Sequence, residues 1–83
     1  MNHKKIQTTV QANGDTSVTE LGWVSTENLD RDMDRERQRF SAIARTGRSI
    51  YKDIQTVETT TTSVVVIYES GTVRVINYVP EGA

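Results

Sequence analysis

Apolar and polar positions alternate poorly in the last third of the chain. Residues 63–68 read Ser-Val-Val-Val-Ile-Tyr, residues 73–79 read Val-Arg-Val-Ile-Asn-Tyr-Val, and Ser70-Gly71 lies between these two runs. β-Branched runs separated by a glycine-containing turn predict two antiparallel strands that form a hairpin. A strand with one face in water alternates apolar and polar residues, and these two strands mostly do not. The pattern therefore predicts a hairpin that is apolar on both faces.

A two-residue turn at Ser70-Gly71 would set how the two strands of this hairpin pair. It predicts that Tyr68 and Val66 face the core. An 83-residue chain is one small domain, so we expect the other face to be covered by a second copy or by another protein. The residues predicted for this second, interface-forming face are Val65, Ile67, Arg74, Ile76 and Tyr78.

Residues 4–24 are predicted to form an N-terminal hairpin. Ile6 and Val10 share one side of the first strand, which predicts one buried face. Asn13-Gly14 is typical of a type I′ turn, in which both central residues have positive φ. The alternation of the second strand slips near residues 20–22, and this slip predicts a β-bulge there.

Residues 26–45 are predicted to form a helix. Leu29, Met33 and Phe40 recur at helical spacing and form a narrow apolar stripe, which Glu36 interrupts near its middle. A stripe of this width predicts a helix that packs on a sheet along a thin seam and leaves most of its surface in water.

Residues 49–79 are predicted to supply three further strands, which gives the element order ββαβββ. We therefore predict one α+β domain over residues 1–83. Its antiparallel sheet should have four or five strands, with one amphipathic helix packed on one face.

Composition narrows the classes of function. The chain has no cysteine and one histidine, which excludes disulfides and thiolate metal sites, so we expect no metal and no cofactor. The formal net charge is −1, which makes a nonspecific nucleic-acid binder an unfavoured alternative. No apolar run approaches the ~20 residues of a membrane span, and we expect a cytoplasmic protein.

The charged residues of the predicted helix leave two interpretations open. Arg31, Arg35 and Arg39 stack at i,i+4 spacing and could form a cationic ridge for an anion. Alternatively, acids three or four residues away pair with the arginines on a solvated surface. Arg45 and Arg48, at the end of the helix, are a second candidate pair for anion binding. The pairs expected under the second interpretation are Glu27/Arg31, Asp32/Arg35, Asp34/Arg37 and Glu36/Arg39.

Two further residues carry expectations about packing. Trp23 is expected in the core, where it would cover Met33 or Phe40. Arg74 is expected to meet a carboxylate, from Glu58, Glu69 or a neighbouring subunit, because an unpaired buried guanidinium is very costly.

We find no arrangement of side chains typical of an enzyme, since the serines and threonines have no nearby histidine base. In size, loose threonine-rich patterning and lack of active-site residues, the chain resembles small accessory proteins of phages and mobile elements. This resemblance implies a non-enzymatic binding module that inhibits or regulates a larger host protein. We expect a homo-oligomer, most simply a dimer. The alternatives are a binder of a small anionic ligand, such as a nucleotide at a subunit interface, and a nucleic-acid-binding regulator.

Overall fold

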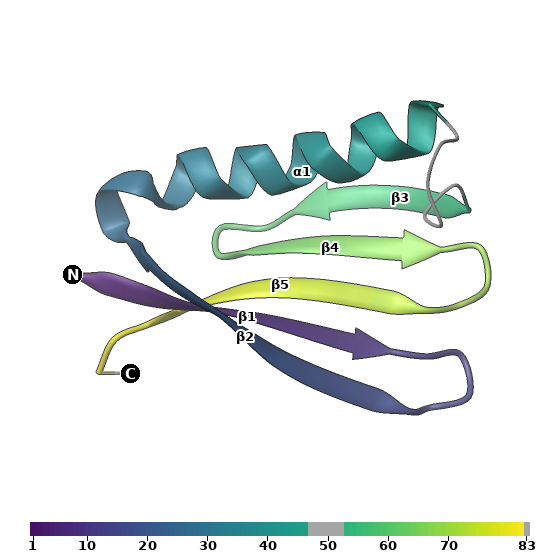
Figure 1. The fold of residues 1–83 in the computed structure, drawn as a ribbon, viewed down its shortest axis with the longest axis horizontal. Helices are drawn as coiled ribbons and strands as arrows, with labels where there is room; N and C mark the ends of the chain where they lie inside the picture. The colour runs from purple at the N-terminus through teal and green to yellow at the C-terminus, as the bar shows by residue number, and fades with distance from the viewer. Residues whose placement is uncertain (47–52, 83) are drawn as a thin grey trace.

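The computed structural model describes the backbone of residues 1–46 and 53–82 and the side chains of residues 1–41 and 53–82. All five strands form one antiparallel sheet with the order β2-β1-β5-β4-β3. This arrangement confirms the predicted α+β fold and its element order (Figure 1). In chain order the elements are β1 (Asn2–Val10), β2 (Thr16–Ser25), the 3-10 turn η1 (Thr26–Asn28), α1 (Leu29–Thr46), β3 (Ile54–Thr59), β4 (Ser63–Tyr68) and β5 (Val73–Pro80).

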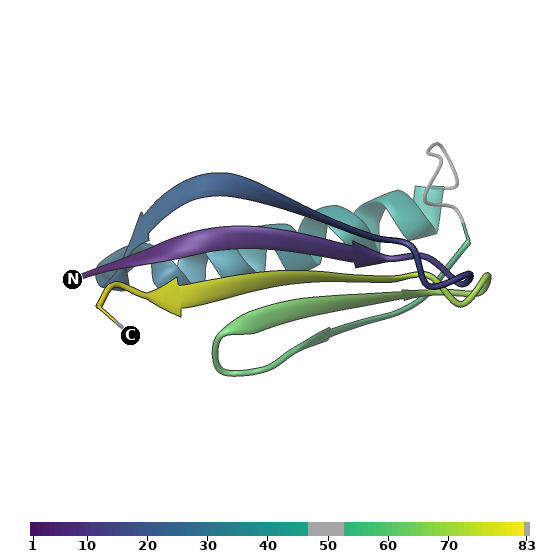
Figure 2. The same cartoon turned by 90° about the horizontal axis from the view of Figure 1, so that it is seen from below.

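The helix lies on one side of a curved sheet. Figure 1 shows α1 running beside β3 and β4, while β2 lies at the far edge and rises to meet the start of the helix. Figure 2 shows that the sheet bends, so that β2 curves toward the side on which α1 lies. The helix and the sheet thus enclose a core on one face, and no described element covers the other face.

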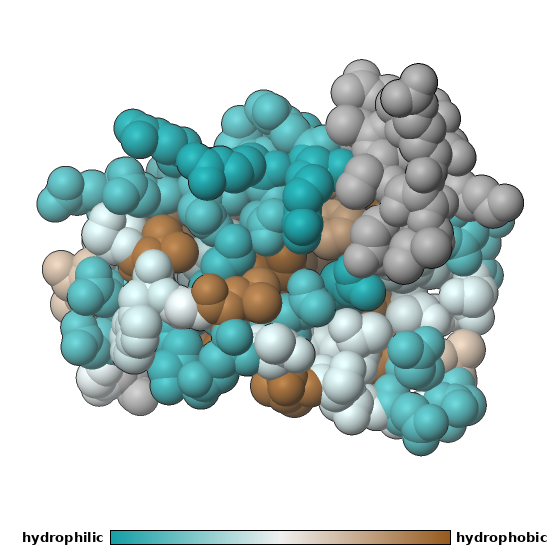
Figure 3. Space-filling model, in the orientation of Figure 1, coloured by the Kyte–Doolittle hydropathy of each residue, from teal (hydrophilic) through white to brown (hydrophobic). Residues whose placement is uncertain are grey.

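The core contains the predicted apolar stripe of the helix. Met33 and Phe40 are buried there, and Leu29 is partly buried against the same cluster. Seen from the side of Figure 1, hydrophilic side chains gather over α1, and hydrophobic atoms show only in separate patches below it (Figure 3). The sheet residues that complete this core are Val64, Val66, Tyr68, Ile76 and Tyr78.

The β4–β5 hairpin turns differently from the prediction. Glu69, Ser70 and Gly71 form a three-residue loop, closed by a hydrogen bond of 2.9 Å from the Tyr68 N–H to the Thr72 carbonyl. Gly71 has φ of 95°, the left-handed conformation that ends loops of this length. The predicted two-residue turn is therefore wrong by one residue.

The one extra loop residue shifts the register of β5 by one position. Because side chains alternate along a strand, this shift exchanges the two faces of β5. Val64 pairs with Ile76 and Val66 with Arg74, so these side chains share the helix side of the sheet. The predicted placement of Arg74, Ile76 and Tyr78 on the open face is wrong. Ile76 and Tyr78 are 0% and 1% exposed and lie in the core.

The N-terminal hairpin closes in the same way. The Gln11 N–H donates to the Asp15 carbonyl at 2.7 Å, and the Gly14 N–H donates to the Gln11 carbonyl at 2.9 Å. Gly14 has φ of 95°, and no described non-glycine residue has positive φ. The predicted type I′ turn, which needs positive φ at Asn13 as well, is wrong. The Asn13 side chain instead accepts a hydrogen bond from the Asp15 N–H at 3.0 Å.

The predicted bulge in β2 is confirmed. Lys5 pairs with Gly22 and Ile6 with Glu20, which leaves Leu21 as the extra residue. The face assignment of β1 is wrong, however, because Ile6 pairs with Asn77 and lies on the side away from the helix. Residues 49–52, the start of the predicted strand before β3, lie outside the described residues.

Candidate functional site

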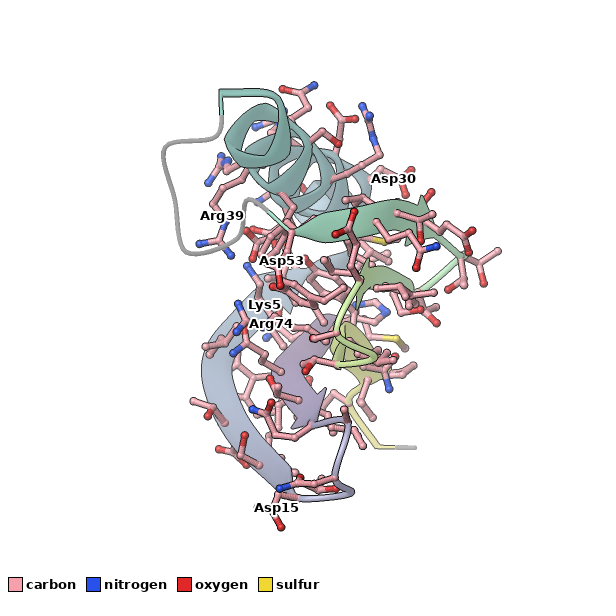
Figure 4. All side chains as sticks on the ribbon, turned by 90° about the vertical axis from the view of Figure 1, so that its right-hand side faces the viewer. Lys5, Asp15, Asp30, Arg39, Asp53 and Arg74 are labelled. Carbon is pink, nitrogen blue, oxygen red and sulfur yellow. The ribbon has the colours of Figure 1, made fainter. Side chains whose placement is uncertain are left out.

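A charged cluster joins β1 and β5 to the helix. The Lys5 ammonium lies 2.8 Å from the Asp32 carboxylate and 3.1 Å from the Glu36 carboxylate. The Tyr78 hydroxyl donates a hydrogen bond of 2.5 Å to Asp32, and Arg39 Nε lies 3.0 Å from Glu36. Figure 4 shows the labelled Lys5 and Arg39 extending on the same side of the molecule. Glu36, which interrupts the apolar stripe, is thus buried with cationic partners from two elements.

The surroundings of Asp32 and Tyr78 shift the pKa values of these two residues in opposite directions. Burial alone raises the pKa of Asp32, but hydrogen bonds from Lys5 and Tyr78, with the charges of Lys5 and Arg35, outweigh it. The pKa of Asp32 is therefore lowered. Burial, followed by the hydrogen bond to Asp32 and the nearby carboxylate charges, raises the pKa of Tyr78 far above its ordinary value. Asp32 remains a carboxylate and Tyr78 a phenol at neutral pH.

This cluster is best explained as a network of ion pairs and hydrogen bonds that stabilises the fold. The side chains of Lys5, Asp32 and Glu36 are only 15%, 18% and 9% exposed, so a substrate would have little access to them. Among the described residues, no group of three or more histidine, cysteine, aspartate and glutamate side chains could hold a metal ion.

Arg74 lies on the helix side of the sheet and contacts aromatic rings. Its guanidinium carbon is 5.9 Å from the Phe40 ring centroid and 5.8 Å from that of Tyr68, within the range of a cation–π interaction. Glu58 pairs with Val65 on the opposite side of the sheet, so this predicted partner of Arg74 is excluded.

The uncovered side of the sheet, which we call the open face, is rich in aliphatic side chains. Val65 pairs with Val75 and Ile67 with Val73, so the hairpin presents an aliphatic surface. Val65 and Ile67 lie where the sequence placed them. Val73 and Val75 were missed, because the wrong turn length assigned them to the core. The aliphatic residues of the open face include Ile6, Val10, Val65, Ile67, Val73, Val75 and Val79, all partly or fully exposed. Lys4, Thr8, Trp23 and Asn77 lie on the same face.

The helix arginines divide into paired and unpaired residues. Arg37 lies 2.7 Å from Asp34, and Arg39 pairs with Glu36, so two of the four expected pairs are confirmed. Within the described part of the chain, Arg31 and Arg35 form no ion pair. Asp32, the expected partner of Arg35, contacts Lys5 and Tyr78 instead. The expected pairs Glu27/Arg31 and Asp32/Arg35 are therefore not formed.

Arg31 and Arg35 line a pocket in the corner between the end of β2 and the first half of α1. Its volume is about 250 Å³. Trp23 borders this space, but its ring lies on the other side of the sheet: Trp23 pairs with Lys4, whose ammonium is 5.3 Å from the ring centroid. Trp23 is 56% exposed, so its predicted core position is wrong. The full lining is Trp23, Val24, Ser25, Asn28, Arg31, Asp32 and Arg35, and we call this space the Trp23 pocket.

Of the remaining anion-binding candidates, Arg39 is held by Glu36. The side chain of Arg45 and the whole of Arg48 lie outside the described residues, so their role stays a prediction. The Trp23 pocket was not foreseen as a unit, because nothing in the local pattern indicates that β2 and the helix meet at a corner.

Comparisons with known proteins add no relatives. No protein family model matches this sequence, and neither a curated protein nor a solved structure shows significant similarity to it. In the described part of the chain, no helix is long and apolar enough to cross a membrane.

Proposed function

We propose that this protein is a non-enzymatic binding module that forms a two-fold dimer by stacking the open faces of two sheets. The observation that supports this proposal is the group of adjoining aliphatic side chains on β1, β5 and β4, in which Val73 pairs with both Val10 and Ile67, and Val75 pairs with Val65. Contiguous exposed apolar surface is uncommon on monomeric soluble proteins and marks sites of association.

The shape of the open face suits a second copy of the same chain. Two sheets pack face to face at a separation of about 10 Å when β-branched side chains on both inner surfaces interdigitate. In this arrangement Val65 and Val75, which pair at the centre of the face, would contact their symmetry mates. A two-fold axis makes the same surface serve both partners.

The area of the open face is close to that of a standard protein–protein interface. Five strands about 4.8 Å apart, each about 20–30 Å long, present a surface on the order of 600 Å² before side-chain relief is counted. A standard stable interface buries about 800 Å² on each partner. Stacking the whole face would therefore approach that size.

The charges on this side favour protein over nucleic acid. Lys4 lies 3.2 Å from Glu20 at the β2 side, and Glu58 lies on β3, so the face has no excess of cations. A surface that binds nucleic acid through phosphates needs such an excess. We further infer that the dimer acts in the cytoplasm by contact with a larger protein, in the manner of phage accessory proteins.

Sedimentation equilibrium tests the dimer. We expect the wild-type chain to sediment as a dimer and Val75→Asp, which places a charge at the centre of the open face, to sediment as a folded monomer. Val75→Thr keeps the shape of the side chain and should weaken the dimer without unfolding the protomer. Ser17→Asp, on the opposite side of the sheet, should remain a dimer.

A wild-type monomer at high concentration would overturn the proposal. So would a Val75→Asp variant with the wild-type circular dichroism spectrum and an unchanged dimer mass, because the interface would then lie elsewhere. If wild type is monomeric alone and forms a one-to-one complex with another protein through Val75, the open face has a different occupant and the dimer is rejected.

A further inference from the structure

We propose that the two sheets of the dimer cross each other, with the two-fold axis lying between them along one diagonal of the open face and with Trp23 as the anchor at one end. This inference rests on the proposed dimer and defines its geometry. The occupant of the open face is a second copy of this chain, because the residues on the two sides of the diagonal complement one another when the axis exchanges them.

The β-bulge in β2 places Trp23 on the open face. In a regular strand, residues three apart point to opposite sides of the sheet, so Glu20 and Trp23 would face apart. Leu21 is the extra residue of the bulge. On one side of it Glu20 pairs with Ile6, and on the other side Trp23 pairs with Lys4, two residues from Ile6 along β1. The bulge thus brings the single tryptophan of the chain to the open face, where it is exposed.

The largest apolar side chains of the open face follow one diagonal. Each member lies one strand across and two residues along from the one before it. The members are Trp23 on β2, Ile6 on β1, Val75 on β5 and Ile67 on β4, and we call them the diagonal stripe. The opposite diagonal, from Thr16 through Thr8 to Asn77, is polar. The apolar surface therefore runs obliquely to the strands and not along any one of them.

An axis along the diagonal stripe exchanges residues that match in kind. Lys4 and Glu20 flank the stripe on opposite sides of Trp23 and pair within one protomer at 3.2 Å. The axis brings Lys4 of each protomer toward Glu20 of the partner subunit, so opposite charges meet. Near the other end, Val65 and Val73 flank the stripe on opposite sides and exchange in the same way. A two-fold interface must be self-complementary, and the surroundings of the stripe meet this requirement.

An axis parallel to the strands fits less well. With that axis over β5, the middle strand, β2 of one protomer would lie over β3 of the other. Val18 and Glu58 lie in one row across the sheet, so a carboxylate would meet an aliphatic side chain. Trp23 would project past the end of β4, which begins at Ser63 in the row of Glu20. Sheets also pack with their strands crossing at near right angles, and this arrangement places Trp23 within the contact.

Trp23 fluorescence distinguishes the crossed dimer from other dimers. Because the chain has one tryptophan, its emission reports on this position alone. We expect the emission maximum to move to shorter wavelength as the concentration rises through the dissociation constant measured by sedimentation. Val75→Asp, as a monomer, should keep the long-wavelength emission at every concentration. A wild-type dimer that keeps the long-wavelength emission would overturn the crossed arrangement and leave the dimer itself intact.

Truncation of Trp23 tests its role as the anchor. Trp23→Ala should weaken the dimer at least about tenfold, as is usual for a buried aromatic residue at the centre of a contact, and Trp23→Phe should weaken it less. Leu21→Ala is the control, because Leu21 is another exposed apolar residue of β2 and lies outside the diagonal stripe. Since Trp23 is exposed in the protomer, both variants should fold, which circular dichroism verifies. Equal dissociation constants for Trp23→Ala and Leu21→Ala would show that Trp23 is not the anchor.

A charge exchange tests the direction of the axis. Lys4→Glu and Glu20→Lys each place like charges across the axis in their own dimers, whereas a mixed dimer of the two variants has opposite charges at both contacts. We expect the mixed dimer to be at least about tenfold tighter than either unmixed one in native mass spectrometry. The altered pair within each protomer is the same in both kinds of dimer, so the preference reports on the contact between subunits.

An ion pair on the helix provides the matched control. Arg37→Glu and Asp34→Lys make the same changes of charge at an exposed pair away from the open face, and their mixture should show no preference. Random mixing of the Lys4→Glu and Glu20→Lys variants would overturn the crossed axis. An equal preference in the helix control would do the same, because net charge alone would then explain it. A monomeric wild-type chain would overturn both this geometry and the proposed dimer.

Discussion

The hydroxyl of Tyr78 donates a hydrogen bond of 2.5 Å to the carboxylate of Asp32, and this contact joins the last strand to the first half of the helix. The two residues are 46 positions apart in the sequence. Lys5 from β1 contacts the same carboxylate at 2.8 Å. One acid on the helix thus holds two neighbouring strands of the sheet, and its surroundings lead to the first predictions.

Tyr78→Phe should destabilise the protein by about 1.5–3 kcal/mol, because a buried hydrogen bond to a charged group is lost. The measurement is urea unfolding at pH 7. Asp32→Asn and the double variant complete a thermodynamic cycle, in which we expect a coupling energy of at least about 1 kcal/mol. Additive effects of the two substitutions would show that the residues do not interact.

Stability should fall at both extremes of pH through the same pair. The pKa of Asp32 is lowered by folding, so its contribution is complete above the unfolded value of about 4 and is lost as the pH falls through the lower folded value. The pKa of Tyr78 is raised by folding, so its contribution is complete below about pH 10 and is lost as the pH rises further. Unfolding free energies measured across pH should show both losses, and Tyr78→Phe should lack the alkaline one. An unchanged alkaline loss in that variant would assign it to another group.

Lys5→Met should be strongly destabilising, by about 3–5 kcal/mol, because it leaves two carboxylates close together without their shared cation. Lys4→Met is the matched control. Lys4 lies on the opposite side of β1 and pairs with Glu20 where its side chain is 36% exposed, so its loss should change stability by no more than about 1 kcal/mol. Equal effects of the two substitutions in thermal unfolding would contradict the register of β1.

Ile76→Asp should prevent folding, because a charge at a fully buried position costs several kcal/mol and an 83-residue domain has a total stability of only about 4–12 kcal/mol. Val75→Asp, one residue earlier, should fold. Circular dichroism of the two variants tests the register of β5. With a two-residue turn, Val75 would face the core, and Val75→Asp would be the variant that fails to fold.

Gly14→Val should lower the melting temperature clearly, since a β-branched side chain is strained at φ of 95° and would cost about 2 kcal/mol. Gly14→Asn should cost less than about 1 kcal/mol, because asparagine tolerates this conformation. Space is not the cause of either effect, since a Cβ at Gly14 would have no atom within 4 Å. Equal melting temperatures for the two variants would show that the turn does not hold this backbone conformation.

The sequence predicts the elements of this fold well where the local pattern of apolar and polar residues is enough to identify them. The spacing of Leu29, Met33 and Phe40 predicts the helix, and the break in alternation around Gly22 predicts the bulge. The strand order could not be read, because local pattern does not say that β5 would lie between β1 and β4.

The faces of β5 could not be predicted for a physical reason. Since Val75 and Ile76 are both apolar, either can face the core, and only the turn decides between them. A glycine at position 71 is compatible with both a two-residue and a three-residue loop. For the same reason Tyr78 was assigned to a partner contact, when its ring is buried and its hydroxyl bonds to Asp32.

The candidate sites also differ in how far local sequence could predict them. Val65 and Ile67 were found from the sequence, because β4 is apolar on both sides. The Trp23 pocket was not, since it depends on where the end of β2 meets the helix. Its arginines were singled out from the sequence. Only the tertiary structure shows that Arg39 pairs with Glu36, while Asp32, the expected partner of Arg35, contacts Lys5 and Tyr78 instead.

Both borders of the sheet are irregular, and this limits how copies of the chain can assemble. Leu21 interrupts the ladder in β2, and the pairing of β3 skips Gln55 between Ile54 and Thr56. A broken ladder is a poor template for another strand, so neither edge strand favours edge-to-edge growth of the sheet into a fibre. Association of this protein should therefore stop at a closed pair and should not continue into a polymer.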